Sequence, residues 1–439
     1  MRKPVACIVG RPNVGKSTLF NKIVGKRISI TEDTPGVTRD RIYADANWLN
    51  TDFKMIDTGG LDLKDDDTFM KSIAIQVEIA IDHADVIIFV VDGTTGVTST
   101  DLEIAEKLRK SGRQIVLAVN KLDTKGVEDK LYEFYELGIG EPMMISAENS
   151  IGIGDLLDEV VREFPSFEED PDESKKIRVA FIGKPNVGKS SMINKFLGED
   201  RLIVTNIPGT TRDSIDSDFT HNGVEYVFVD TAGMRKRKKI YENVERYSVI
   251  RTLSAVDDAD VCVAVIDAEE GISEQDTKII GYAHYNGKAL IVAVNKWDLI
   301  EKETNTAKQF EYRIREMLGF ANYAEVIFVS ALTGQRLYKM LDTINLVYEN
   351  YNRRISTGVL NDIINNAVLM NQTPSDKGKQ GKIYYASQVD VKPPKFIIHV
   401  NEKDLIHFSY VRYLENQIRS NFDFKGTPII MELRERKGE

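Results

Sequence analysis

The sequence predicts two tandem α/β domains, each with a mostly parallel sheet covered by helices on both faces, followed by a small α+β domain. Three observations lead to this fold class. Short apolar runs alternate with helical patterns, a set of motifs occurs twice in the same order, and the segment from 350 onward shares none of those motifs. The sheets are expected to be parallel because strands buried on both faces read as continuous apolar runs.

The composition is that of a folded protein with several cores. The chain has 439 residues, 42% of them hydrophobic and 29% charged, with a net charge of −10. This length allows two or three domains. The longest apolar runs, such as DVIIFVV, are short, whereas a membrane helix needs roughly 20 residues. The N-terminus has no signal-peptide core, and Cys7 and Cys262 are expected to be buried thiols of a cytoplasmic protein. The five histidines lack metal-ligand spacing.

A phosphate-binding pattern occurs twice. The stretch GRPNVGKSTLFNK begins at Gly10, and GKPNVGKSSMINK begins at Gly183. In the pattern G-x-x-x-x-G-K-[ST], the glycines let the backbone approach phosphate oxygens, the lysine reaches the β- and γ-phosphates, and the hydroxyl holds Mg²⁺. Each match follows an apolar run and opens an amphipathic segment, so the strand–loop–helix context of a P-loop is present both times.

Three further motifs repeat in step with the loops. They are DTGG at 57–60 and DTAG at 230–233, NKLD at 120–123 and NKWD at 295–298, and SAE at 146–148 and SAL at 330–332. The spacing between the two copies is the same for the phosphate loops and for the DTGG and DTAG motifs. It is larger for each of the two later motif pairs. Such growth is expected when a second copy has gained short loop insertions. The chain therefore contains a tandem duplication of one domain.

The duplication sets the expected domain boundaries. They are a first domain at 1–164, an acidic linker at 165–176, a second domain at 177–349 and a third domain at 350–439. In the first copy the expected strands are 4–10, 53–58, 85–92, 114–120 and 143–146, and the expected helices are 16–24, 68–82, 99–111, 127–137 and 153–163. All four motifs then fall at the carboxyl ends of strands, where such sheets bind ligands.

The N-K-x-D motif identifies the base. Asp123 and Asp298 can each accept hydrogen bonds from N1–H and the 2-amino group of guanine. Adenine offers neither donor, and a site built on such bonds rejects the analogue without them by ~10⁴ or more. The neighbouring residues are expected to complete the site: Asn120 and Asn295 brace the loop and touch N7, Lys121 and Lys296 cover the ring, and Ala147 and Ala331 direct a backbone N–H at the guanine oxygen. The predicted nucleotide is GTP.

The remaining motif residues are assigned to the phosphates and the metal. Lys16, Thr38, Lys189 and Thr211 are the catalytic candidates, and Ser17, Thr38, Asp57, Ser190, Thr211 and Asp230 are the Mg²⁺ candidates. Thr38 and Thr211 lie in matching PGVTRD and PGTTRD segments, where an ordinary turn is the alternative. The GTP-binding set is Gly10, Arg11, Pro12, Asn13, Val14, Gly15, Lys16, Ser17, Thr18, Asp57, Thr58, Gly59, Gly60, Asn120, Lys121, Leu122, Asp123, Ser146, Ala147, Gly183, Lys184, Pro185, Asn186, Val187, Gly188, Lys189, Ser190, Ser191, Asp230, Thr231, Ala232, Gly233, Asn295, Lys296, Trp297, Asp298, Ser330 and Ala331.

With these motifs in place, the whole chain resembles the Der (EngA) family of bacterial double GTPases. The resemblance implies two TRAFAC-type P-loop GTPase domains, a KH-like C-terminal domain, GTP and Mg²⁺ as ligands, and a role in assembly of the large ribosomal subunit. The implied partners are ribosomal RNA and ribosomal proteins, with no membrane, for a chain expected to be a cytoplasmic monomer.

Two positions in each copy bear on how GTP would be hydrolysed. Leu61 and Met234 stand where Ras-like proteins carry the glutamine that orients the attacking water, and neither side chain can do so. Asn13 and Asn186 resemble an asparagine of related GTPases that are activated by K⁺, which would neutralise charge on the leaving phosphate. Bracing of the loop is the alternative role for this asparagine. Hydrolysis is therefore expected to be slow and stimulated by potassium.

The C-terminal domain is expected to have α-β-β-α-β order, which resembles the KH-like family. The expected elements are a helix at 358–372, strands at 382–389 and 395–400, a helix at 404–420 and a strand at 428–436. GKQG at 378–381 matches the G-x-x-G clamp of KH domains in letters, but it precedes a strand rather than joining two helices. It is interpreted as a turn.

Basic residues are concentrated in two places. From residue 350 onward there are 14 Lys and Arg against 10 Asp and Glu, a modest bias. Directly after the second DxxG motif, the run at 234–239 has five consecutive basic residues. This run is either a solvated surface or a contact to ribosomal RNA that forms in one nucleotide state.

Three functions stay open from the sequence. The first is a GTP-hydrolysing switch in ribosome assembly. The second is a GTPase serving tRNA modification or transport, which no additional catalytic or membrane motif supports. The third is a scaffold that holds GTP and hydrolyses it very weakly, which Leu61 and Met234 favour.

Overall fold

The computed structural model describes residues 3–25, 43–60, 69–123, 128–165, 175–199, 216–229, 245–376 and 378–435. The chain forms two compact units, the first built mainly on residues up to 171 and the second mainly on the residues that follow. Within the described ranges, no helix combines the length and the apolar character needed to cross a membrane. Several predicted features lie outside these ranges: Thr38, Thr211, Leu61, Met234, the DTAG motif at 230–233, the basic run at 234–239 and linker residues 166–174.

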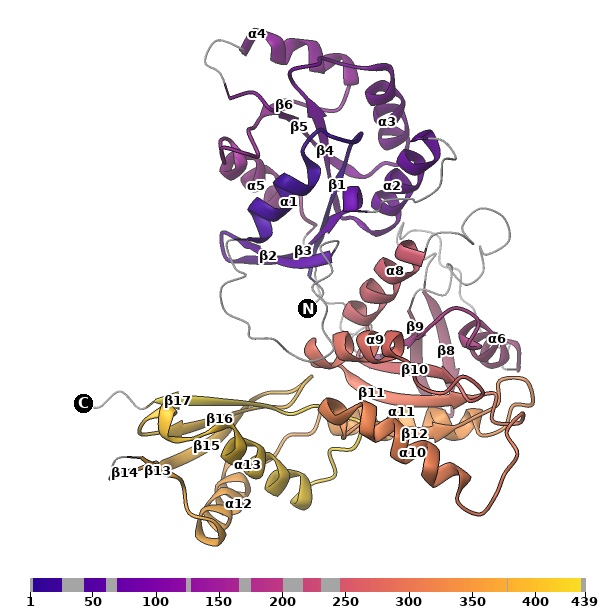
Figure 1. Cartoon of the computed structure of the whole chain (residues 1–439), viewed down its shortest axis with the longest axis vertical. Coiled ribbons are helices and arrows are strands. Elements are labelled where there is room, and N and C mark those ends of the chain that lie inside the picture. The colour runs from indigo at the N-terminus through magenta and orange to yellow at the C-terminus, as the bar shows by residue number, and fades with distance from the viewer. Residues whose placement is uncertain are drawn as a thin grey trace. The chain divides into compact units, whose positions relative to one another are not determined.

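The first unit contains a six-stranded sheet in the order β2-β3-β1-β4-β5-β6. Neighbouring strands are parallel except for the β2–β3 pair, which is antiparallel. Figure 1 shows α1 and α5 on one side of this sheet and α2 and α3 on the other. The elements are β1 (Val5–Val9), α1 (Lys16–Val24), β2 (Tyr43–Trp48), β3 (Thr51–Asp57), the 3-10 turn η2 (Thr58–Gly60), α2 (Phe69–His83), β4 (Val86–Asp92), α3 (Ser99–Lys110), β5 (Gln114–Asn120), α4 (Glu128–Leu131), η3 (Tyr132–Leu137), β6 (Pro142–Met144) and α5 (Ile153–Arg162).

The predicted strands and four of the predicted helices of the first copy are confirmed, whereas the helix predicted at 127–137 is only the short α4 followed by the 3-10 helix η3, and one strand was missed. Every residue of β4 is buried, which explains its continuous apolar run. The buried residues of α5 are Ile153, Leu156, Leu157 and Val160, the spacing of one helix face. Strand β2 was not predicted because its sequence YADANW has no such run. As an antiparallel edge strand it buries only Tyr43 and Ala46, and its other residues are partly or fully exposed.

The second domain repeats this topology. Its six-stranded sheet has the order β12-β11-β10-β7-β9-β8, with β8 and β9 antiparallel. One apolar core lies between the sheet and α6 and α11, and another lies between the opposite face and α8, α9 and α10. The elements are β7 (Ile177–Ile182), α6 (Lys189–Glu199), β8 (Ser217–His221), β9 (Val224–Phe228), α8 (Glu245–Asp258), β10 (Val261–Asp267), α9 (Glu274–Tyr285), β11 (Ala289–Asn295), α10 (Thr306–Met317), η5 (Gly319–Ala321), β12 (Glu325–Phe328) and α11 (Leu337–Tyr351).

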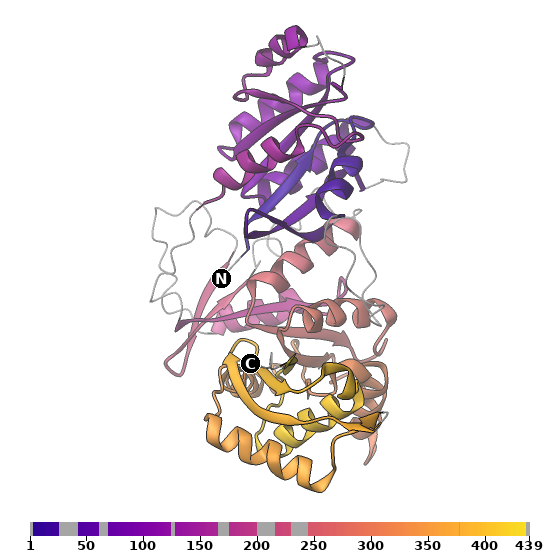
Figure 2. The same ribbon diagram turned by 90° about the vertical axis from the view of Figure 1, so that its left-hand side faces the viewer.

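The C-terminal domain has the predicted α-β-β-α-β order, with an additional short hairpin of β13 and β14 after the first helix. Strands β15 and β16 are antiparallel, β16 and β17 are parallel, and α12 and α13 pack on the sheet around one apolar core. Figure 2 shows this domain facing the viewer. The elements are α12 (Thr357–Met370), β13 (Ser375–Asp376), β14 (Lys379–Gln380), β15 (Ile383–Asp390), β16 (Lys395–Val400), η6 (Lys403–Leu405), α13 (Phe408–Asn421) and β17 (Ile430–Glu435).

Three local details confirm or correct the predictions for this domain and its boundary. The GKQG segment lies in the β13–β14 hairpin, with Gly378 at φ +80°, so its interpretation as a turn is confirmed. The last helix begins at Phe408 rather than at 404, because the chain first forms η6 and then buries Ile406 in the core. The predicted boundary at 349 falls inside α11, which continues to Tyr351.

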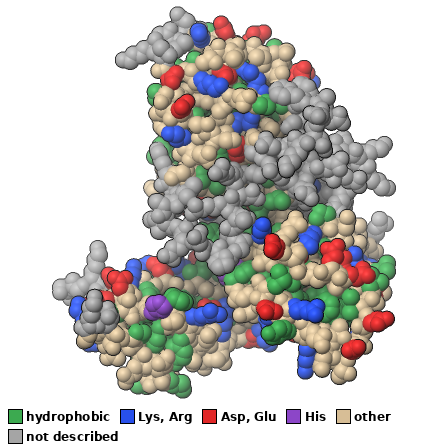
Figure 3. Space-filling view, in the orientation of Figure 1, with side chains coloured by type: hydrophobic (Ala, Val, Ile, Leu, Met, Phe, Trp, Pro, Cys, Tyr) green, Lys and Arg blue, Asp and Glu red, His purple; other side chains and the backbone are tan. Residues whose placement is uncertain are grey.

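The second and C-terminal domains belong to the same compact unit. Gly426 joins them through two backbone hydrogen bonds: its carbonyl accepts from the N–H of Leu290, and its N–H donates to the carbonyl of Tyr323, both at 2.7 Å. The N–H of Lys392, between β15 and β16, donates to the carbonyl oxygen of Tyr351 at the end of α11 at 3.1 Å. These hydrogen bonds hold the two domains together within one unit. Figure 3 shows acidic and basic side chains interspersed among the described residues of one face.

Candidate nucleotide sites

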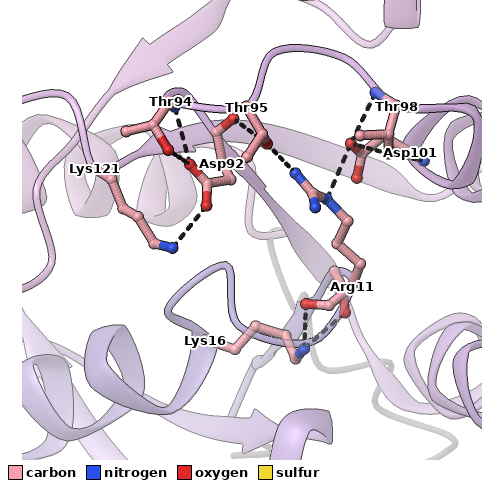
Figure 4. Close-up of polar contacts among 9 residues, drawn as sticks. Arg11, Lys16, Asp92, Thr94, Thr95, Thr98, Asp101 and Lys121 are labelled. Atoms are coloured by element: carbon pink, nitrogen blue, oxygen red, sulfur yellow. Dashed lines mark hydrogen bonds and ion pairs between the residues drawn. The ribbon is translucent and has the colours of Figure 1, made fainter.

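The first phosphate loop connects β1 to α1. The chain enters the helix through Gly15 at φ +98°, where a Cβ atom would lie 2.2 Å from Nδ2 of Asn120, so that glycine alone fits. The buried Lys16 follows, and its Nζ donates to the carbonyl oxygens of Gly10 at 2.7 Å and Arg11 at 2.8 Å. The loop thus curls around an ammonium group at the start of a helix, which is how this motif presents itself to phosphates (Figure 4).

The second loop has the same geometry. Gly188 has φ +102°, and its Cβ atom would lie 2.1 Å from Nδ2 of Asn295. Lys189 donates to the carbonyl oxygens of Gly183, at 2.6 Å, and of Lys184. Asn13 and Asn186 both have φ +65° and exposed side chains, so each loop presents its asparagine in the same backbone conformation.

Asp57 and Lys16 lie close together in the first site. Asp57 ends β3, is buried, and accepts a hydrogen bond from the N–H of Gly59 at 2.8 Å. A Cβ atom on Gly59 would lie 2.7 Å from Cε of Lys16, so the lysine stem runs beside this motif. Burial lowers the pKa of Lys16 to about 8, although the Asp57 carboxylate partly opposes the shift. A phosphate would supply the negative charge that this poorly solvated ammonium group lacks.

The same segment offers oxygen ligands for a divalent cation. The buried Asp57 carboxylate ends β3, and Ser17 presents an exposed hydroxyl in the first turn of α1. Carboxylate and hydroxyl oxygens suit Mg²⁺, so these residues fit the metal that the motif requires. Their counterpart Ser190 is described, whereas Asp230 lies outside the described residues.

The motif asparagines join the phosphate loop to the base loop. Asn120 donates from Nδ2 to the carbonyl oxygen of Val14 at 2.7 Å, and its Oδ1 accepts from the N–H of Ala147 at 2.9 Å. In the second copy, Asn295 bonds Val187 and Ala331 at the same two distances. The predicted bracing role is therefore confirmed. The N–H of Ala147 and of Ala331, expected to point at guanine, is bonded to the asparagine in this structure.

The motif lysines are held by aspartates that sequence reasoning missed. Nζ of Lys121 lies 2.6 Å from Oδ2 of Asp92 at the end of β4, and Nζ of Lys296 lies 2.5 Å from Oδ2 of Asp267 at the end of β10. Burial opposes ionisation of Asp92, but hydrogen bonds from Lys121 and Thr94 outweigh it and lower the pKa. The two aspartates are separated by the same interval as the two N-K-x-D motifs, and that repeat could have revealed them.

The aspartates of the two N-K-x-D motifs differ between the copies. Asp123 is exposed, and its Oδ2 accepts from Nδ2 of Asn149 at 2.8 Å. Asp298 has a buried Oδ1 without a hydrogen-bond partner in the described part of the chain. Because a buried carboxylate oxygen is costly without a donor, this oxygen fits the N–H groups of a guanine base.

Several residues of the predicted binding set turn their side chains away from the site. Val14, Val187 and Trp297 are core residues, and Trp297 packs against Phe328 with ring centroids 4.3 Å apart. Leu122 is also buried. The buried Thr58 hydroxyl donates to the carbonyl of Ile8 at 2.7 Å. Ser146 and Ser330 accept backbone hydrogen bonds from Asn149 and Thr333 and thereby shape the turns of their loops.

Comparison with known proteins agrees with this geometry. A family model described as 50S ribosome-binding GTPase matches residues 5–121 and again 178–296, and one described as the KH-domain-like C-terminal domain of EngA bacterial GTPase enzymes matches residues 354–434. GTPase Der of Clostridium perfringens is 57% identical over 437 residues, which cover 100% of both chains, and GTPase Der of Clostridium tetani is 58% identical over the same length. GTPase Der of Agathobacter rectalis is 56% identical over 439 residues, covering 100% of this chain and 99% of its own.

The chain belongs to the Der (EngA) family. It is a GTPase that binds GTP and GDP. The predicted fold class, two P-loop GTPase domains followed by a KH-like domain, is confirmed. Two Der-type GTPase domains on one chain also explain why each motif, brace and lysine–aspartate pair occurs twice.

Proposed function

We propose that the chain is a GTP-driven switch in the assembly of the large ribosomal subunit, with ribosomal RNA and ribosomal proteins as partners. The observation that carries this proposal is the match of both nucleotide domains to a family described as 50S ribosome-binding GTPase. The two complete base loops support it, because each copy then reads its own guanine nucleotide. The protein acts in the cytoplasm as a monomer.

Each nucleotide site works with Mg²⁺. Ser17, Thr38 and Asp57 would hold the metal in the first copy, and Ser190, Thr211 and Asp230 in the second. Bound Mg²⁺ would neutralise charge on the β- and γ-phosphates. Lys16 and Lys189 bind the same phosphates, and the buried position of Lys16 strengthens that interaction because little water competes. Hydrolysis is slow, since Leu61 and Met234 cannot orient a water molecule, and it is stimulated by potassium bound at Asn13 and Asn186.

Two nucleotide sites allow a gate with two inputs, by which we mean that binding to a partner depends on the nucleotide held in both copies. Each copy can hold GTP or GDP, and each state orders its own switch segment differently. Binding to the ribosomal particle requires GTP in both copies. The basic run at 234–239 contacts RNA phosphates in the GTP state of the second copy, which makes binding steeply dependent on salt.

The test is co-sedimentation of the full chain with large ribosomal subunits in a non-hydrolysable GTP analogue. Lys16→Ala, Lys189→Ala and the double variant are compared with the unmodified chain over a salt series. We expect each single variant to bind about tenfold more weakly or worse, because each removes one GTP input. Single variants that sediment with the particle as well as the unmodified chain would disprove the gate. An unmodified chain that does not sediment with it would disprove the ribosomal function.

A further inference from the structure

A second ion pair lies beside each phosphate loop, and the nucleotide motifs do not account for it. Oδ2 of Asp101 lies 3.2 Å from Nε of Arg11, and Oδ2 of Asp276 lies 3.5 Å from Nζ of Lys184. Arg11 and Lys184 follow the first glycine of their loops, and the two aspartates are separated by the same interval as the N-K-x-D motifs. The arrangement occurs in both copies although the cation changes from arginine to lysine. Figure 4 shows the Arg11–Asp101 pair in the first copy.

The two aspartates also cap helices. The Thr98 hydroxyl donates to Oδ2 of Asp101 at 2.7 Å in the capping box that begins α3. The Ser273 hydroxyl makes the same bond to Asp276 at 2.7 Å at the start of α9. A capping box satisfies backbone N–H groups and does not by itself require burial. The cap therefore explains why an acid stands at this position, but not why it is buried.

Because these carboxylates are buried, each needs a nearby cation to compensate its charge. Asp101 is 0% and Asp276 is 3% exposed. Oδ1 of each has no hydrogen-bond partner among the described residues, so the interactions of each carboxylate are concentrated on Oδ2. An ionised carboxylate buried in this way is costly unless a positive charge compensates it. Arg11 and Lys184 supply that charge.

The same two cations connect the aspartates to the catalytic lysines. The carbonyl oxygen of Arg11 accepts a hydrogen bond from Nζ of Lys16 at 2.8 Å, and the carbonyl oxygen of Lys184 accepts from Nζ of Lys189. Arg11 is thus fixed by its side chain to the start of α3 and by its backbone to the phosphate-binding lysine. If the loop moved away from α3, the carboxylate would be left buried without its cation.

The loop before α3 contacts the nucleotide site at both ends. Asp92 holds Lys121 at the base side, and the Thr95 hydroxyl accepts a hydrogen bond from Arg11 at the phosphate side. In the second copy, Asp267 holds Lys296, and Oε2 of Glu270 lies 3.5 Å from Nζ of Lys184. A short segment thus supports the base lysine and the phosphate loop together.

We propose that Asp101 and Asp276 are positioning residues of the two nucleotide sites. Each holds its phosphate loop against the following helix, through Arg11 or Lys184, and thereby slows the release of bound nucleotide. The inference rests on the proposed assignment of 10–18 and 183–191 as nucleotide loops. Release is slow because opening of the loop separates the buried carboxylate from its cation, which raises the barrier.

The experiment measures nucleotide release from one copy of the full chain. Asp298→Asn removes guanine binding from the second copy, the first copy is loaded with N-methylanthraniloyl-GDP, and excess GDP starts the chase. Asp101→Asn keeps an oxygen for the cap but loses the charge, and Arg11→Met removes the cation. We expect each to speed release about tenfold, and the double variant to be no faster than the faster single variant because the two residues act as one unit.

Two matched variants separate positioning from capping. Arg11→Lys is expected to release nucleotide as slowly as the unmodified loop, since the second copy carries lysine at this position. Thr98→Ala breaks the cap but leaves the ion pair, so it should lower the urea midpoint without changing the release rate. The mirror set in an Asp123→Asn chain is Asp276→Asn, Lys184→Met and Lys184→Arg, with Ser273→Ala as the capping control.

The possible results are distinguishable. Unchanged release in Asp101→Asn and Arg11→Met would overturn this inference alone, as would a Thr98→Ala variant that accelerates release as much as Asp101→Asn. Failure of the Asp298→Asn chain to bind the labelled GDP would overturn the nucleotide-site assignment itself, and this inference with it.

Discussion

Asn295 donates a hydrogen bond from Nδ2 to the carbonyl oxygen of Val187 across 2.7 Å, and its Oδ1 accepts from the N–H of Ala331 at 2.9 Å. The asparagine is buried, so both bonds are shielded from water. One side chain therefore holds the phosphate loop and the base loop of the second copy at a fixed separation. Asn120 does the same in the first copy.

Asn295→Ala should destabilise the second unit and weaken guanine nucleotide binding together. The variant leaves a buried carbonyl and a buried N–H without partners, which costs about 2 to 4 kcal/mol of unfolding free energy. Urea unfolding and a nucleotide titration measure the two effects. Asn305→Ala is the matched control, because Asn305 precedes α10 without a side-chain capping bond and is exposed. It should change stability by less than about 0.5 kcal/mol. Equal effects of the two substitutions would contradict the bracing role.

Asp123→Asn and Asp298→Asn should each convert one copy from guanine to xanthine preference. An amide nitrogen donates where the carboxylate accepted, so it repels the N–H groups of guanine and suits the additional oxygen of xanthine. Equilibrium binding of labelled GDP and XDP to the full chain gives the stoichiometry of each base. A variant that keeps the guanine stoichiometry of the unmodified chain would show that the altered loop does not read the base.

Hydrolysis should be faster in potassium than in sodium at equal ionic strength. Asn13→Ala and Asn186→Ala should each reduce the difference in their own copy, since the exposed side chains lie in matching loop conformations. Phosphate release in the two salts measures the effect, and the Asp298→Asn and Asp123→Asn backgrounds isolate the copies. Equal rates in both salts would exclude the cation and favour the weakly hydrolysing scaffold.

The second unit should lose stability as the pH falls below about 6.5. Nδ1 of His284 lies 2.9 Å from the hydroxyl oxygen of Tyr323. Burial lowers the pKa of His284, and the nearby Arg419 guanidinium lowers it further. Between the folded and unfolded pKa values the unfolded chain binds the extra proton, so acid favours unfolding by up to about 1.4 kcal/mol per pH unit. Above about 6.5 both states are neutral and the penalty vanishes.

Urea unfolding between pH 5 and pH 7.5 tests this pH dependence. His284→Gln has no group that titrates in this range and should flatten the profile. A profile equally steep in the variant would assign the acid sensitivity to other groups.

Gly426→Ala should weaken the junction between the second and C-terminal domains. Gly426 has φ +68°, and a Cβ atom there would lie 2.3 Å from Cγ2 of Val347. Backbone strain and the clash together should cost about 2 to 4 kcal/mol. Thermal unfolding and limited proteolysis between the domains are the measurements. Gly358→Ala is the control, because its Cβ atom would have no neighbour within 4 Å and it lies in α12. That change should be neutral or stabilising by up to about 1 kcal/mol.

The sequence by itself determined the duplicated architecture and the identity of the nucleotide. Apolar runs such as β4 and β10 could be recognised because parallel strands are buried on both faces. Guanine as the base was predicted from Asp123 and Asp298, since hydrogen-bond chemistry depends on residue type and spacing. The edge strand β2 was missed because a half-exposed strand has no distinctive apolar run.

Only the tertiary structure determined which charged side chains form ion pairs. Arg11 and Asp101 lie far apart in the sequence, and Lys121 and Asp92 come from different strands, so no local pattern pairs them. It also placed Trp297 in the core, although the motif position of this residue suggested a ligand contact. Local patterns report backbone periodicity and short-range chemistry. The pairing of distant charges depends on how the sheet brings its strand ends together, because burial and partner distance are properties of the folded chain.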